Sequence, residues 1–203
     1  YDTALASPGS AVLRGGWVAI GVSEAMQGSS DLDGDGDADG NIVHAYELAT
    51  GVLVPLGIDA HALVASGERL FLLPSEELAA LDWNADGDAR DRVLFAWNAA
   101  GGPLRSSGSA AGELLAAQGS TALLLLREAE RGEDANDDGD LDDHVLALHD
   151  VERGTRRTIA LAAGSFARLT PDLSVLILVD ELAQGRDLNG DGDRADEVLH
   201  LAR

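Results

Sequence analysis

The chain has 203 residues, 45% hydrophobic and 25% charged, a balance typical of one folded domain rather than of a disordered chain. Acidic residues outnumber basic ones by 36 to 14, and the formal charge of −22 excludes nucleic-acid binding through a basic surface. Cysteine is absent, which excludes disulfides and thiolate metal sites, and no apolar run approaches the roughly 18 residues of a membrane-spanning helix.

Short apolar runs, β-branched or rich in leucine and separated by glycine, follow one another along the chain and predict β-strands rather than helices. The clearest runs are residues 17–22, 42–46, 70–73, 93–97, 122–126, 145–148, 175–179 and 198–201. Tight turns are expected before every second run, at residues 15–16, 66–67, 118–119 and 170–172. Further turns are expected at residues 49–51, 100–102 and 152–154, after the runs 42–46, 93–97 and 145–148.

Four acidic segments divide these runs into repeats. They begin at Asp31, Asp82, Asp134 and Asp187, which are 51, 52 and 53 positions apart. Each repeat therefore reads as strand, tight turn, strand, acidic loop, strand, turn and strand. Four short antiparallel strands in about fifty residues are typical of a β-propeller blade. The sequence predicts an all-β chain, a β-propeller of four blades.

The two ends of the chain predict how the ring closes. The fourth repeat stops after its third strand, and residues 1–8 could supply the missing one, which leaves no exposed edge. We expect a single domain over residues 1–203, with blades at about 10–60, 61–111, 112–164 and 165–203 plus 1–9. The alternatives are four blades cut from a larger ring, or a homodimer of eight blades. The first residue is Tyr1, not Met, which predicts a processed product or part of a longer protein.

The acidic loops place oxygen ligands at alternate positions. Counted from the first Asp, positions 1, 3, 5 and 7 are Asp or Asn and position 6 is glycine; position 10 is Asp in three loops, while the first loop has Asp39 at position 9. Alternating oxygens followed by a glycine that permits a sharp bend can wrap one hard cation. The candidate ligands are Asp31, Asp33, Asp35, Asp37 and Asp39; Asp82, Asn84, Asp86, Asp88 and Asp91; Asp134, Asn136, Asp138, Asp140 and Asp143; and Asp187, Asn189, Asp191, Asp193 and Asp196.

Calcium is the cation that this ligand set favours. Ca²⁺ accepts six to eight oxygens with flexible geometry, whereas zinc prefers His or Cys, and none lies within the loops. The loops are not EF-hands, because position 12 is Ile or Val where that motif needs Glu. The alternative is a set of solvated acidic turns, but the loops hold 19 of the 36 acidic residues, whose mutual repulsion a cation would relieve. We expect up to four bound Ca²⁺.

A glutamate recurs at the end of the strand before each loop, as Glu24, Glu76, Glu128 and Glu181. Two interpretations are open. The glutamate is an additional ligand of the cation or a partner for an arginine of the loop, or it is a charged strand end that faces water.

The repeats resemble those of TolB-like propellers, also called PD40 or WD40-like repeats. The resemblance is carried by the turn and strand at residues 170–178, the acidic loop and strand at 187–199 and the turn at 48–51. The loops are also similar to integrin-type FG-GAP repeats, whose loop joins the first two strands instead. The resemblance implies an exported propeller with calcium in its blades. Leu173 replaces the expected turn glycine, and four repeats are fewer than the six of TolB.

The expected function is a non-catalytic binding or scaffold module with an unknown protein or glycan ligand, in an exported bacterial protein. Extracellular calcium modules bind with Kd of ~10⁻⁴–10⁻³ M, which suits export. An enzyme with a site in the central channel and a structural repeat domain of a larger surface protein are the alternatives. The histidines follow no catalytic motif; Trp17 and Trp97 are expected in the core, and Trp83 is a candidate for stacking on a sugar.

Overall fold

The computed structural model describes residues 11–60 and 62–203 and confirms an all-β chain. Its strands are joined by turns and loops, and the two helices of the described residues have four residues each. The chain divides into two compact units, with the boundary between Ala110 and Ala111. Neither described helix has the length and apolar character that a membrane span requires.

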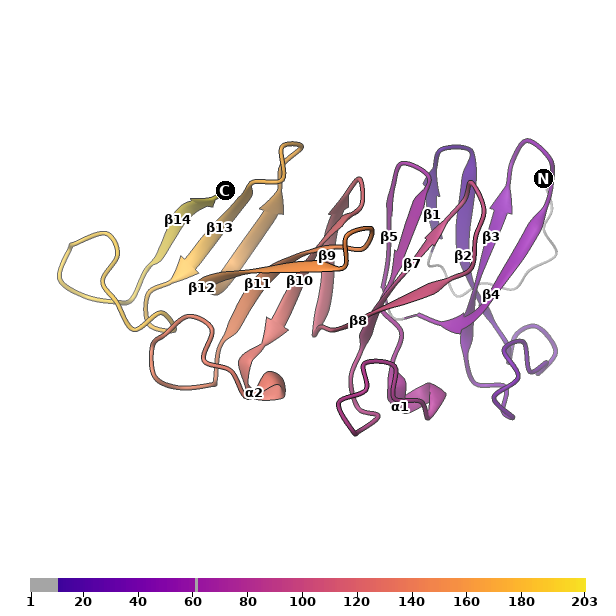
Figure 1. Cartoon of the computed structure of the whole chain (residues 1–203), viewed down its shortest axis with the longest axis horizontal. Helices are drawn as coiled ribbons and strands as arrows, with labels where there is room; N and C mark the ends of the chain where they lie inside the picture. The colour runs from indigo at the N-terminus through magenta and orange to yellow at the C-terminus, as the bar shows by residue number, and fades with distance from the viewer. Residues whose placement is uncertain (1–10, 61) are drawn as a thin grey trace. The chain divides into compact units, whose positions relative to one another are not determined.

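The first unit contains two four-stranded antiparallel sheets in which consecutive strands are neighbours (Figure 1). The first sheet consists of β1 (Ala11–Arg14), β2 (Trp17–Ser23), β3 (Asn41–Glu47) and β4 (Leu53–Asp59). The second consists of β5 (Leu63–Ser66), β6 (Arg69–Leu72), β7 (Val93–Asn98) and β8 (Arg105–Ala110), with α1 (Glu76–Ala79) after β6. This order of strands is the one that the repeats predict.

The second unit contains a six-stranded antiparallel sheet. It consists of β9 (Glu113–Gln118), β10 (Thr121–Arg127), β11 (His144–Asp150), β12 (Thr155–Leu169), β13 (Val175–Asp180) and β14 (Glu197–Ala202), with α2 (Glu128–Arg131) after β10. The expected separate third and fourth blades are joined, because the fifteen residues of β12 pair first with β11 and then with β13. The partner changes between Ala162, which pairs with Val145 of β11, and Ala163, which pairs with Val179 of β13.

The fourth repeat contributes three described strands, from the second half of β12 to β14. The strand expected to complete it, residues 1–8, lies outside the described residues, as does His61. The closed four-bladed ring therefore stays a prediction.

Each unit has its own cluster of buried apolar residues. In the first unit, Ala19 and Val43 of the first sheet pack in one cluster with Leu72, Phe95 and Trp97 of the second. In the second unit, a further cluster joins residues of β10 and β11 to residues of β13. The middle strands are buried along nearly their whole length, so they are covered on both faces. This pattern explains why the central runs read as continuously apolar.

The acidic loops all join the second strand of a repeat to the third, at the end of the strands opposite the tight turns (Figure 1). The short helices α1 and α2 begin two of these connections, at residues where the sequence has no helical periodicity. Each helix ends at a residue in the left-handed region, Ala80 with φ of 51° and Gly132 with φ of 60°. The chain thereby turns from the strand into the loop.

Candidate metal centre

The first aspartate of each acidic loop holds the loop in a tight bend. In the fourth loop, Oδ1 of Asp187 accepts a hydrogen bond from the backbone N–H of Gly190 at 2.5 Å, and Oδ2 accepts one from Gly192 at 2.9 Å. The corresponding aspartates Asp31, Asp82 and Asp134 accept the same two bonds. Asp and Asn side chains commonly bond to their own backbone in this way in turns.

A second series of bonds runs along each loop. The side-chain oxygens at positions 3, 5 and 7 each accept the backbone N–H two residues later, at 2.9–3.3 Å in all four loops. The four loops therefore share one conformation, as their common spacing predicts. Each carboxylate keeps oxygen lone pairs that these bonds do not occupy.

The glycine at position 6 is required by the backbone. Gly36, Gly87, Gly139 and Gly192 have φ of 101°, 102°, 103° and 102°, a conformation that L side chains rarely adopt. The bend that the sequence predicts at this position is confirmed.

The third and fourth loops each bring three carboxylates together. Oxygens of Asp138, Asp140 and Asp143 lie within 4.8 Å of one another, and so do those of Asp191, Asp193 and Asp196 (positions 5, 7 and 10). The structure thus brings together part of each predicted ligand set. The bonds of Asp134 and Asp187 instead bend the loop around this group.

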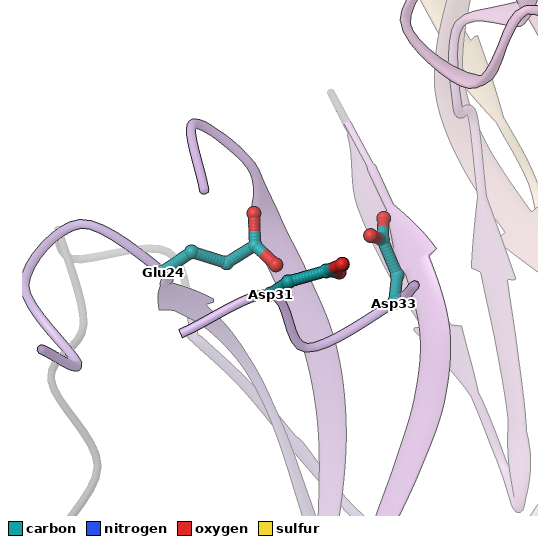
Figure 2. A group of neighbouring side chains, drawn as sticks. All are labelled: Glu24, Asp31 and Asp33. Carbon is teal, nitrogen blue, oxygen red and sulfur yellow. The ribbon is translucent and has the colours of Figure 1, made fainter. Parts of the chain in front are cut away.

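The first loop gathers a different set, because its tenth position is Gly40. There Glu24 lies with Asp31 and Asp33, their oxygens again within 4.8 Å, and the three carboxylates converge in Figure 2. A Cβ on Gly40 would lie 2.9 Å from Oε2 of Glu24 and 2.8 Å from Cδ1 of Ile42, so a larger residue would require these side chains to shift. The predicted ligands Asp35, Asp37 and Asp39 lie outside this group of three.

The second loop is held by an amide. The side-chain N–H₂ of Asn84 donates to Asp86 at 2.9 Å and to Asp91 at 2.7 Å, which draws positions 5 and 10 toward position 3. Asn189 makes the same two bonds in the fourth loop. The second loop has two further carboxylates, Asp82 and Asp88. Asp88 accepts a hydrogen bond from the backbone N–H of Arg90.

The surroundings of the carboxyl groups at position 10 disfavour their ionised form. Partial burial is the main cause that raises the pKa of Asp91 and that of Asp143 from 3.8 to about 6 in each case. Repulsion from Asp138 adds to the rise in the pKa of Asp143. The bond from Asn189 lowers the pKa of Asp196, but Asp191 and other nearby charges outweigh it and raise that pKa overall. A bound cation would relieve this repulsion.

The four recurring glutamates are buried, so the interpretation as charged strand ends that face water is wrong. Glu24 is 1% exposed and Glu76, Glu128 and Glu181 are 0% exposed. Their carboxylates accept backbone N–H groups of the loop: Oε1 of Glu181 accepts those of Leu188 at 2.5 Å and Asn189 at 3.1 Å. Equivalent bonds fix the other three loops to their strands.

Two of these glutamates have oxygens without a hydrogen bond among the described residues. Oε2 of Glu128 and Oε2 of Glu181 are buried and have no partner. A buried charged oxygen without a partner is costly, and both residues precede a loop whose carboxylates converge. The donor set is entirely oxygen and carries a high negative charge, which fits a hard divalent cation and not zinc.

A contact that the sequence did not reveal joins the third loop to the next repeat. Asn136 is 3% exposed, and its side-chain amide donates to the carbonyl of Ala183 at 3.2 Å as well as to Asp143 at 2.8 Å. Gln184, 2% exposed, donates to the carbonyl of Asn136 at 3.1 Å. The recurrence of glutamine at equivalent repeat positions, Gln27 and Gln184, is the available sequence signal.

The aromatic residues and histidines contribute to packing. Trp97 is buried and meets Trp17 edge-on at 5.3 Å between ring centroids, as expected for core residues. Trp83 is half-buried and meets Phe95 edge-on at 5.0 Å, which leaves less of it free than the sequence predicted. His44 is buried, with Nδ1 3.0 Å from the carbonyl oxygen of Ile42.

No protein-family model and no curated protein matches the chain. Among solved structures, it is similar to the crystal structure of HIRA(644-1017), with 13% identity and a TM-score of 0.46 over 87% of this chain and 49% of that one. It is also similar to the tricorn protease, with 13% identity and a TM-score of 0.47 over 94% of this chain and 22% of that one. The chain thus spans half or less of these two chains, and the low TM-scores carry no weight for fold or function.

Proposed function

We propose that the chain is a calcium-binding β-propeller of the TolB-like type that acts as a non-catalytic binding or scaffold module. In this proposal one Ca²⁺ binds each acidic loop and stabilises the blade, and the N-terminal strand closes a ring of four blades. The protein is exported, and its partner is a protein or a glycan.

The convergence of Asp138, Asp140 and Asp143, repeated by Asp191, Asp193 and Asp196, is the observation that carries the calcium proposal. Two loops far apart in sequence place carboxylates at positions 5, 7 and 10 within reach of one ion. Since like charges at this spacing repel, a bound cation would stabilise the arrangement. Calcium tolerates the irregular geometry of such a set better than magnesium does.

The expected contribution to stability is moderate for each site and large in sum. With Kd of ~10⁻⁴–10⁻³ M and roughly 1 mM calcium, each site contributes about 0.4–1.4 kcal/mol, or up to ~6 kcal/mol for four. That sum is comparable with a domain's net stability of roughly 5–15 kcal/mol. The proposed export follows, because such sites would be largely empty at cytosolic calcium levels.

The test is thermal unfolding of the whole chain in calcium, in magnesium and after dialysis against EDTA, together with isothermal titration of calcium. We expect removal of calcium to lower Tm by several degrees or more, re-addition to restore it, and magnesium to restore it less. An unchanged Tm together with no heat of binding would refute the proposal. Native mass spectrometry then separates a monomeric ring from an eight-bladed dimer.

A further inference from the structure

The first unit contains a cavity of about 590 Å³, lined by residues of the first acidic loop, of β4 and of the second repeat. One wall is the first acidic loop, through Asp33, Asp35, Asp37 and Asp39, with Asp59 of β4 beside it. No basic residue is among the described residues that line the cavity. One divalent cation bound in the loop would leave this wall negative, because the loop alone carries five aspartates.

The part of the lining that the second repeat contributes is mostly apolar. It includes Leu78 of α1, Leu81 and Trp83 in the second loop, and Leu104 before β8. Leu78 and Leu81 are 57% and 55% exposed, an unusual state for two large apolar side chains in one cavity. The volume lies within the range of about 300–1,000 Å³ that is typical of ligand-binding pockets.

The lining includes two positions at which the second unit has a hydrogen-bonded amide pair. In the second unit, Gln184, three residues after Glu181, bonds to Asn136 at position 3 of the preceding loop. The equivalent residues in the first unit are Ala79, three residues after Glu76, and Asp33, and both line the cavity. In the first unit a short side chain and a carboxylate thus stand at the two positions of this amide pair.

An edge strand also lines the cavity. Leu56, Gly57 and Ile58 belong to β4, which ends the strand order of its sheet, and they lie within the register shift of its pairing with β3. An edge strand offers backbone donors and acceptors to an extended peptide. A small amine would use the acidic wall but not this edge.

We propose that this cavity binds a short peptide segment in which an arginine or lysine stands next to a large apolar side chain. The cation would contact the aspartates of the first loop, and the apolar side chain would cover Leu78 and Leu81. This binding goes beyond the calcium proposal, and it does not depend on it, because the cavity is acidic with or without the ion.

The test is fluorescence anisotropy with the labelled tripeptide Arg-Trp-Arg, compared with Glu-Trp-Glu and Arg-Gly-Arg, on the full chain in calcium buffer. We expect Arg-Trp-Arg to bind, Glu-Trp-Glu not to bind, and Arg-Gly-Arg to bind roughly tenfold more weakly or worse. Absence of binding by Arg-Trp-Arg, or equal binding of all three peptides, overturns the proposal.

Two variants place the binding in the cavity. Ala79→Gln introduces the glutamine that stands at the equivalent position of the fourth repeat, and its longer side chain should occupy part of the cavity. Leu78→Ser removes one exposed apolar contact. Each variant should bind Arg-Trp-Arg about tenfold more weakly. Leu182→Ser is the matched control, since Leu182 is 71% exposed and lies in the second unit. Circular dichroism shows whether each variant is folded. If Ala79→Gln is unfolded, the affinity of Leu78→Ser tests the proposal by itself. Unchanged affinity in Leu78→Ser overturns the proposal.

Discussion

The side-chain amide of Gln184 donates a hydrogen bond to the backbone carbonyl of Asn136 at 3.1 Å, although the two residues are 48 positions apart. Oε1 of Gln184 accepts the backbone N–H of Ala162 at 2.8 Å, so one buried side chain connects three segments. The third acidic loop is thereby fixed to the segment that leads into the fourth. Cation binding at either loop should therefore depend on the same buried contact.

Replacement of Gln184 by leucine, which has a similar volume, should destabilise the chain by about 1–3 kcal/mol. The reason is that the N–H of Ala162 and the carbonyl of Asn136 lose their partner in a buried place. Urea unfolding measures the change. Gln118→Leu is the control, because Gln118 is exposed and its replacement should change stability by less than about 0.5 kcal/mol. Equal losses in both variants would contradict the structural role of Gln184.

Replacement of a glutamate before a loop by glutamine should destabilise the chain. Glu76 accepts N–H groups on both oxygens, from Trp83 at 2.5 Å and from Asp91 at 3.2 Å, so glutamine would set a donor against a donor. We expect Glu76→Gln to cost about 1–3 kcal/mol of unfolding free energy. The neighbouring Glu77 is exposed, and Glu77→Gln should be nearly neutral. Measurement in EDTA excludes any effect through the cation, and a neutral Glu76→Gln would show that the bonds are dispensable.

The sequence predicts the strands and loops well because both depend on local chemistry. The strand expected at residues 17–22 is β2, Trp17–Ser23, and the glycine bend at Gly192 is present with φ of 102°. Short apolar runs between turns and a required left-handed conformation each leave a local signal. The predicted four-stranded repeat is likewise visible in the order of β1 to β4.

The remaining features depend on contacts between segments, for which the sequence has no local signal. A charged residue at a strand end usually faces water, and only the folded loop supplies the N–H groups that make burial of Glu181 favourable. The continuity of β12 across two repeats depends on its partners β11 and β13. The cavity beside Ala79 is visible only when the first loop and α1 are both in place.

The metal-free chain should become more stable as the pH falls from neutral toward about 5. The pKa of Asp91 and that of Asp143 are raised from 3.8 to about 6, mainly by partial burial, so the folded state binds more protons than the unfolded one between these values. The contribution of these two carboxyls to stability therefore decreases as the pH rises through this window. The pKa of His149, lowered mainly by desolvation, acts in the opposite direction, so the expected sign follows from two carboxyls against one imidazole. The prediction is checked by measuring Tm between neutral pH and about pH 5 after removal of calcium; Tm should rise as the pH falls.

Calcium should reverse this dependence. The cation requires ionised carboxylates, so the rise in Tm on adding calcium should shrink as the pH falls through about 6. A constant calcium effect across this range would argue that Asp91 and Asp143 are not ligands. Magnesium at the same concentration controls for ionic strength and divalent charge.

The position of a carboxylate, and not its charge alone, should determine calcium affinity. Asp143 lies in the group with Asp138 and Asp140, whereas Asp142 is one position earlier and outside it. Asp143→Asn should weaken one site by at least about tenfold, since affinity follows the number of charged ligands, and Asp142→Asn should change it little. Isothermal titration compares the two variants, which carry the same change in net charge. Equal losses would indicate attraction by general charge without a defined site.

The turn before β13 contains a strained residue that glycine should relieve. Leu173 has φ of 64°, in the left-handed region that costs an L residue roughly 1–2 kcal/mol, and it is 37% exposed. Glycine has no such cost but loses more entropy on folding, so Leu173→Gly should stabilise the chain by about 0.5–1 kcal/mol. The reverse change at the equivalent turn, Gly119→Ala, should destabilise it, because Gly119 has φ of 60°. Denaturant midpoints measure both variants, and a loss of stability in Leu173→Gly would mean that the side-chain contacts outweigh the strain.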